Sequence, residues 1–224
     1  MKEKKNIPYV TTNLRNHIIE APEIIRKASG IVIFGKRIKS LIFSTDVAVI
    51  KNTNADAIMS VYPFTPQPII TQSLILASDV PVFCGVGGGT TTGKRVTNLA
   101  LDAEFKGAMA VVLNSPTTDD VIKSVRKTID IPIVVSVVSE HEDIKARIDA
   151  GVTIFNVSGA KDTAKIVRNI RKEYPNFPII ATGGPTDESI LETIEAGANA
   201  ITFTPPSNTE IMRSLMEKYR GDML

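Results

Sequence analysis

Short runs of apolar residues recur along the chain from about residue 40 onward and alternate with amphipathic stretches of about a dozen residues. Each run is apolar throughout, which is typical of a parallel sheet that is buried on both faces. Every run is followed by a segment that we expect to be helical. The pattern predicts eight strand and helix pairs, with strands at residues 40–44, 57–62, 81–86, 108–114, 132–138, 153–157, 178–182 and 200–203.

Two kinds of turn alternate along the chain and support this count. An apolar residue followed by proline opens the odd-numbered strands from the third onward, as at Val80 and Pro81, because the first residue of a strand can lack a ladder partner. A small-residue turn precedes the even-numbered strands, as at Gly151, where glycine accepts the left-handed conformation that ends a helix. Eight units of about 25 residues predict a (βα)8 TIM barrel. A flavodoxin-like open sheet is the alternative, but it would leave two units unexplained.

We expect one domain over residues 1–224, with an N-terminal extension over 1–39 and the barrel over 40–224. Residues 14–28 carry an imperfect apolar stripe, which predicts an extra helix that caps the bottom of the barrel. The apolar run at 31–34 and the run at 41–44 both qualify as the first strand. We favour the later run, because it is followed by a helix-start signal that ends at Asp46.

Composition narrows the classes of function. Of the 224 residues, 26 are basic and 24 acidic, and this balance argues against a nucleic-acid partner. Cys84 is the single cysteine, and His17 and His141 are the two histidines, so an intrachain disulfide and a multi-histidine metal site are both excluded. No apolar stretch approaches the roughly 20 residues that cross a bilayer. We therefore expect a cytoplasmic protein without a membrane partner, a metal or a cofactor.

Gly183 and Gly184 follow the seventh predicted strand, and the eighth strand comes one unit later. With the sequence Glu-Ala-Gly-Ala-Asn-Ala at 195–200, this stretch resembles the terminal portion of the ribulose-phosphate-binding type of TIM barrel. That superfamily includes phosphoribosyl isomerases, thiazole synthase and N-acylmannosamine-phosphate epimerases. The resemblance implies that glycine amides after strand seven, and amides at a short helix after strand eight, hold a substrate phosphate.

The match to this phosphate motif is incomplete. Gly183 and Gly184 agree with it, whereas the residues after strand eight are Thr204, two prolines and Ser207. The prolines remove two potential amide donors. Ser207 stays a candidate for anion binding, and the alternative is that the two glycines only form a tight turn.

The loop after the third strand is rich in glycine. Gly87, Gly88 and Gly89 precede Lys94, and the spacing from Gly88 to Lys94 fits G-x-x-x-x-G-K. Arg95 stands where a P-loop needs a hydroxyl for magnesium, which argues against nucleotide hydrolysis. We expect a lid or an anion-binding loop, with an exposed surface loop as the alternative.

Candidates for proton transfer are few. His141 and Glu140 follow the fifth strand, and Asp46 follows the first, but all three also fit helix N-termini. Cys84 and Asn114 end neighbouring strands, so together with His141 they could form a cysteine-dependent hydrolase site. A buried cysteine in a strand is more often a small core residue.

These features favour an enzyme that acts on a small anionic metabolite, expected to be phosphorylated, by isomerase or lyase chemistry at the C-terminal face of the barrel. Asn114, Asn156 and Thr182 stand at strand ends and are the predicted substrate-binding residues. The alternatives are a hydrolase that uses Cys84 and His141, and a regulatory barrel that binds a metabolite without converting it. A homo-oligomer is compatible with each of these three functions.

Overall fold

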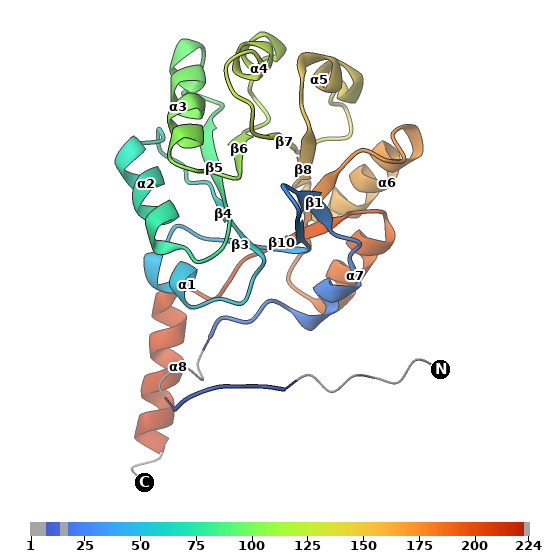
Figure 1. The fold of residues 1–224 in the computed structure, drawn as a ribbon. Coiled ribbons are helices and arrows are strands. Elements are labelled where there is room, and N and C mark those ends of the chain that lie inside the picture. Colours follow the sequence, from blue (N-terminus) through green and yellow to red (C-terminus); the bar gives the residue numbers. More distant parts are fainter. Residues whose placement is uncertain (1–7, 14–17, 222–224) are drawn as a thin grey trace.

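The computed structural model describes residues 8–13 and 18–221. Within this part, eight parallel strands alternate with helices and close into a barrel (Figure 1), so the predicted fold class is confirmed. The barrel strands are β3 (Ser40–Phe43), β4 (Ala57–Ser60), β5 (Val82–Gly87), β6 (Ala110–Leu113), β7 (Ile133–Val137), β8 (Ile154–Val157), β9 (Ile179–Thr182) and β10 (Ala200–Phe203). They are paired in chain order, and β10 closes the barrel against β3.

A helix follows each barrel strand, and all but the last of these helices cover the outside of the sheet. They are α1 (Val47–Lys51), α2 (Pro68–Ala77), α3 (Lys94–Phe105), α4 (Asp119–Arg126), α5 (Ile144–Ala150), α6 (Thr163–Glu173), α7 (Asp187–Glu195) and α8 (Asn208–Gly221), with a 3₁₀ turn η2 (Ala160–Asp162) before α6. Seven of the eight strands lie inside the runs predicted for them, and β5 extends one residue further, to Gly87. No helix in the described ranges is both long enough and apolar enough to cross a membrane.

The N-terminal extension differs from the expected capping helix. Residues 14–17 lie outside the described residues, and the described remainder is helical only in the 3₁₀ helix η1 (Glu23–Lys27). Pro22 stands directly before η1, and a proline disfavours helical backbone in the residue before it. Upstream of it, Ile19 is extended and forms a parallel bridge with Thr53.

A small hairpin closes the bottom of the barrel. Strands β1 (Ile31–Ile33) and β2 (Lys36–Ile38) pair with each other and not with the barrel sheet. Ile31, Ile33 and Ile38 are buried in the cluster that fills the barrel interior. The later run, at β3, is therefore the first barrel strand, and the earlier run forms a plug beneath it.

Helix α8 leaves the barrel and extends away from it beyond α1 (Figure 1). None of its described residues is buried. The 3₁₀ helix η1 instead packs against α7, and its Ile25 belongs to the cluster between sheet and helices that also holds Ile42 and Ile201. The N-terminal segment thus packs on the outside of the barrel beside α7.

Candidate functional site

A cavity of about 480 Å³ lies in the mouth of the barrel, at the carboxyl ends of the strands. Alternate residues of a strand point to opposite faces of the sheet, so the residues two positions beyond the inward-facing Val134, Ile154, Ile180 and Ala200 also face inward. These are Ser136, Asn156, Thr182 and Thr202, all of which line the cavity. We call these four residues the polar arc, because they lie on the consecutive strands β7 to β10.

The polar arc is only partly paired within itself. The Asn156 side-chain amide donates to the Ser136 hydroxyl across 3.3 Å, and the Thr182 hydroxyl donates to that of Ser158 across 3.2 Å. Asn156 Oδ1 and Thr202 Oγ1 are buried and have no hydrogen-bond partner in the described part of the chain. Each buried polar atom without a partner costs about 1–3 kcal/mol. The mouth of the barrel therefore contains polar groups that a ligand can satisfy.

Apolar residues line much of the opposite side of the cavity, and Val138, which follows β7, adjoins them. We call Phe43, Met59, Val61, Pro116 and Val138 the apolar wall of this cavity. Asn114, Ser115, Ser158 and Thr204 complete the lining near the opening. None of these lining residues is ionisable, so the cavity combines neutral polar groups on one side with an apolar surface on the other.

The glycine-rich loop forms a second, smaller cavity beside the first. It has a volume of about 60 Å³, and Gly87 and Gly88 are part of its lining. The two cavities share Val61 and Asn114. A Cβ atom at Gly88 would lie 2.7 Å from the Cβ of Asn114, so only glycine allows the loop to approach this close. The loop is anchored, because the Thr91 hydroxyl donates to that of Thr65 across 3.0 Å.

The three predicted substrate-binding residues thus line one cavity. Asn114, Asn156 and Thr182 come from three different strands and meet at the mouth. Ser136 and Thr202 were not predicted, although the signal was available: they occupy the inward-facing parity of their strands, one pair of residues beyond the apolar layer.

A buried carboxylate braces the loops after β6 and β7. Glu142 Oε1 accepts hydrogen bonds from the Ser115 hydroxyl at 2.8 Å and from the Val138 backbone N–H at 2.9 Å. Arg147 lies 3.8 Å from the other Glu142 oxygen and donates to the Ser115 carbonyl oxygen. Both carboxylate and guanidinium are mostly buried, with side-chain exposures of 13% and 15%. Glu142, a residue not predicted from sequence, therefore positions two members of the cavity lining.

The predicted proton-transfer residues on the same loop lie outside the cavity. His141 is exposed, and its backbone N–H donates to the Ser139 hydroxyl. Glu140 pairs with Lys165 at 2.8 Å, and this hydrogen bond and charge lower the pKa of the Glu140 carboxyl. The ionised Glu140 is therefore a poor proton donor at neutral pH, and the exposed His141 does not line the cavity.

Asp46 caps a helix and does not face the mouth cavity. It is the N-cap of α1, where its Oδ1 accepts from the backbone N–H groups of Ala48 and Val49. Its other oxygen accepts a short hydrogen bond from the Asn208 side chain at the start of α8. Both carboxylate oxygens are thus engaged, and Asp46 does not line the mouth cavity.

Cys84 faces the helices instead of the barrel interior. It is 1% exposed and belongs to the cluster between sheet and helices, whereas its neighbour Phe83 points inward. Burial raises the pKa of the thiol to about 12, so the reactive thiolate is scarce at neutral pH. The structure separates Cys84 from Asn114, which lines the cavity, and from the exposed His141. We therefore discard the hydrolase hypothesis.

The predicted phosphate cradle has few free donors. The Gly183 N–H donates to the Thr202 carbonyl oxygen, and the Ser207 N–H and hydroxyl both donate to Glu210. The Gly184 N–H has no partner in the described part of the chain, but Gly184 does not line the mouth cavity. Gly89 and Lys94 also lie outside the lining of both cavities.

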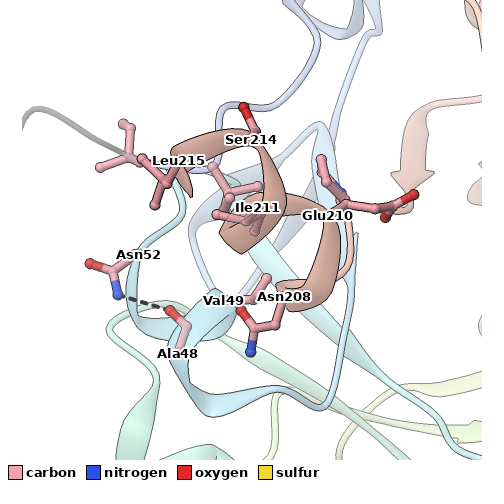
Figure 2. A pocket seen from close by; sticks show the side chains of 11 residues that line it. Ala48, Val49, Asn52, Asn208, Glu210, Ile211, Ser214 and Leu215 are labelled. Atoms are coloured by element: carbon pink, nitrogen blue, oxygen red, sulfur yellow. Dashed lines mark hydrogen bonds between the residues drawn. The ribbon is translucent and has the colours of Figure 1, made fainter. Parts of the chain in front are cut away.

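A groove of about 500 Å³ runs between α1 and α8, outside the barrel (Figure 2). Ile211 and Leu215 of α8 face Val49 of α1 across it, and the Asn52 amide is turned back to the Ala48 carbonyl oxygen at 2.8 Å. The groove shares no lining residue with the mouth cavity, which is where barrels of this kind place their chemistry. The mouth cavity is therefore the candidate functional site.

The described lining of the mouth cavity lacks the residues that hold a metal ion in most proteins. The described residues contain no group of three or more His, Cys, Asp or Glu side chains that could hold one. Magnesium sites usually include one or two carboxylates, and the cavity lining has none. The residues present do not fit a magnesium centre of that kind.

Comparisons with known proteins agree on the fold. No family model matches the chain, and no curated protein matches its sequence. A Burkholderia cenocepacia J2315 protein provisionally assigned as a phosphonomutase is similar in structure, with a TM-score of 0.64, 15% identity, and coverage of 88% of this chain and 97% of that one. Phosphonopyruvate hydrolase, in complex with oxalate and Mg²⁺, is also similar, with a TM-score of 0.60 and 12% identity. The match covers 85% of this chain and 82% of that one.

A third similar structure is 2,3-dimethylmalate lyase, with a TM-score of 0.62, 14% identity and coverage of 84% of both chains. It is described as a member of the PEP mutase/isocitrate lyase superfamily. That superfamily is not the ribulose-phosphate-binding one expected from the sequence. At such low identities these likenesses establish the fold alone.

Proposed function

We propose that this protein is an enzyme that acts on a small anionic metabolite by isomerase or lyase chemistry in the mouth cavity. The observation that carries the proposal is the polar arc at the carboxyl ends of β7 to β10, with two buried polar atoms that lack partners. Enzymes of this fold place their active sites on that face. The cavity volume of about 480 Å³ is within the usual range for small-molecule sites.

The similar structures give this proposal indirect support. They include a lyase and a phosphonopyruvate hydrolase bound to oxalate, a small anion. The described lining supplies hydroxyl and amide groups but no group that titrates near neutral pH. Our candidate for proton transfer is therefore His141, which lies outside the lining. It lies three residues after Val138 of the apolar wall, on a loop braced by Glu142. The imidazole is therefore on the rim of the barrel, close in sequence to the cavity lining.

A non-catalytic metabolite sensor is the second candidate. It is favoured by one observation, namely that no ionisable side chain lines the cavity. General acid and base catalysis normally requires such a group within hydrogen-bond reach. The two candidates share the ligand site and differ in turnover. For either one we propose a cytoplasmic location, in which the single Cys84 stays reduced.

The test begins with thermal-shift screening of short-chain carboxylates and phosphate monoesters. Compounds that raise the melting temperature are incubated with the protein and followed by NMR. We expect new resonances for an enzyme and an unchanged spectrum for a sensor. Asn156→Ala should abolish the thermal shift, whereas the matched variant Asn98→Ala, on the exposed face of α3, should retain it. A full shift in the Asn156→Ala protein would contradict the choice of cavity.

His141→Gln separates binding from chemistry. The side chain is exposed and outside the lining, so the variant should bind the screening hits normally and lose turnover by about 100-fold or more. Unchanged turnover would remove His141 from the proposal without affecting the cavity.

A further inference from the structure

We propose that the substrate carries a chain of several uncharged hydroxyl groups, which lies inside the mouth cavity while the anionic group remains at the opening. This inference rests on the proposed function, because it specifies the ligand of the same site. Four features of the cavity support it: the charge of its lining, the two unpaired polar atoms, their separation and the apolar wall.

The lining limits where charge can be placed. No lysine, arginine or histidine lines the cavity, so an anion drawn inside would meet no opposite charge. Burying an unpaired charge is far more costly than burying a hydroxyl group that finds a hydrogen-bond partner. The anionic group is therefore expected at the opening, where solvent and the exposed Ser158 and Thr204 are available.

Asn156 requires a donor from the ligand. Its Nδ2 is engaged with Ser136 Oγ, which leaves Oδ1 as the unpaired atom. An amide oxygen only accepts hydrogen bonds, and an ionised carboxylate also only accepts them. A carboxylate therefore cannot satisfy Asn156 Oδ1, whereas a hydroxyl group can donate to it.

Thr202 carries the second unpaired polar atom of the cavity. Its residue exposure is 5%, and its hydroxyl has no partner. Rotation about χ1 moves the oxygen of a threonine between staggered positions, and a ligand hydroxyl can donate to it or accept from it. Thr202 is in register with Thr182 on the neighbouring strand.

The two unpaired atoms belong to strands that are not neighbours. Asn156 is on β8 and Thr202 is on β10, with β9 between them. Neighbouring strands are about 4.8 Å apart, so the backbones of β8 and β10 are roughly 10 Å apart. A chain with several hydroxyl groups can reach both and pass Thr182 on the way.

The apolar wall accounts for the other side of such a chain. Phe43 and Met59 stand on β3 and β4, opposite the polar arc. A polyhydroxylated chain presents C–H groups as well as hydroxyl groups, so its C–H edge can pack on this wall while its hydroxyl groups face β7 to β10. A wholly apolar ligand would leave the polar arc unsatisfied.

Matched probes test the hydroxyl requirement. Gluconate and hexanoate have the same six-carbon chain and one carboxylate, but only gluconate carries hydroxyl groups. Xylitol carries hydroxyl groups and no charge. Binding of each is measured by isothermal titration and by saturation-transfer NMR. We expect gluconate to bind at least about 10-fold more tightly than hexanoate, as two or more additional hydrogen bonds imply.

Two isosteric variants test the residues. Thr202→Val removes only the hydroxyl, and Thr193→Val is the matched control, since Thr193 is buried in α7 away from the cavity. We expect Thr202→Val to weaken gluconate binding by about 3- to 10-fold without lowering the melting temperature, because the hydroxyl is unpaired in the free protein. A residue of merely structural importance would not combine lost binding with retained stability. Thr193→Val should leave binding unchanged.

The outcomes separate this inference from the proposed function. Equal binding of gluconate and hexanoate, or a Thr202→Val protein that binds gluconate normally, would overturn the hydroxyl requirement and leave an anion site. Binding of xylitol as tight as that of gluconate would support the requirement and contradict the need for an anion. If neither hydroxylated compound binds, the inference is wrong, whatever the carboxylate and phosphate screen shows.

Discussion

The Ser115 hydroxyl donates a 2.8 Å hydrogen bond to the Glu142 carboxylate, and so joins the loop after β6 to the loop after β7. The same carboxylate oxygen accepts from the Val138 backbone. Ser115 and Val138 both line the mouth cavity. Two separate loops therefore depend on one buried acid for their place at the opening of the barrel.

Glu142→Ala should lower the free energy of unfolding by about 2–3 kcal/mol, because it leaves the Ser115 hydroxyl and the Val138 N–H without their acceptor and weakens the support of Arg147. Glu142→Gln keeps an acceptor oxygen and should cost about 1 kcal/mol. Urea denaturation provides the measurement, and Glu217→Ala on exposed α8 is the control, expected to change stability by less than about 0.5 kcal/mol. Equal stabilities for all three variants would show that the brace is dispensable.

Cys84 should be nearly inert in the folded protein. Its pKa is raised to about 12 by burial, so alkylation by iodoacetamide at pH 8 should be slow in buffer and fast in concentrated urea. The raised pKa also has a consequence for stability: above the usual thiol pKa near 9 the unfolded chain loses the proton first. Cys84 therefore makes stability fall as pH rises from about 9 to 12. A Cys84→Ala protein should lack this alkaline component, and rapid alkylation of the native protein would contradict the burial.

Asp46→Ala should destabilise the protein by about 1–2 kcal/mol, because α1 loses its N-cap and Asn208 loses its partner. Asp46→Asn retains a side-chain oxygen that can cap the helix and should cost less. Thermal unfolding measures both variants. Limited proteolysis provides a second measurement, in which Asp46→Ala should accelerate cleavage within α8. A cleavage rate equal to that of the wild type would mean that Asp46 does not hold α8.

Gly184→Ala distinguishes stability from ligand binding. The residue has φ +82°, and an added Cβ would lie 2.6 Å from Ser189 Oγ, so we expect a loss of about 1 kcal/mol or more. Binding of gluconate should change by less than about two-fold, since Gly184 is outside the cavity lining and a two-fold change is only about 0.4 kcal/mol. A loss of ten-fold or more, measured at a temperature where the variant is folded, would restore the phosphate cradle implied by the sequence resemblance.

The barrel could be predicted from sequence because the apolar runs and the two alternating turn types repeat along the chain. The direction of individual side chains could not. The strand β5 is buried throughout, so its hydrophobic pattern does not reveal that Phe83 points inward and Cys84 outward. Asn114, Asn156 and Thr182 could be placed together at the mouth because polar side chains at the ends of such strands stand out, and their binding of a substrate stays a prediction.

The N-terminal hairpin departs from the pattern of the barrel strands. Phe34 and Gly35 form its turn and both have positive φ, at 47° and 79°, as in a two-residue hairpin turn. Flanking runs of three residues complete β1 and β2. Ile31 and Ile33 alternate with the exposed Val32, which is the half-buried pattern of a hairpin strand and differs from the fully apolar barrel strands.

The hairpin plug limits the ways in which a ligand can enter and leave the barrel. Ile31, Ile33 and Ile38 fill the interior from below, so the bottom of the barrel is closed to a compound that enters by the mouth. For the enzyme proposed above, substrate and product would pass through the same opening. Product bound in the mouth cavity would exclude substrate, and inhibition by product should therefore be competitive with substrate.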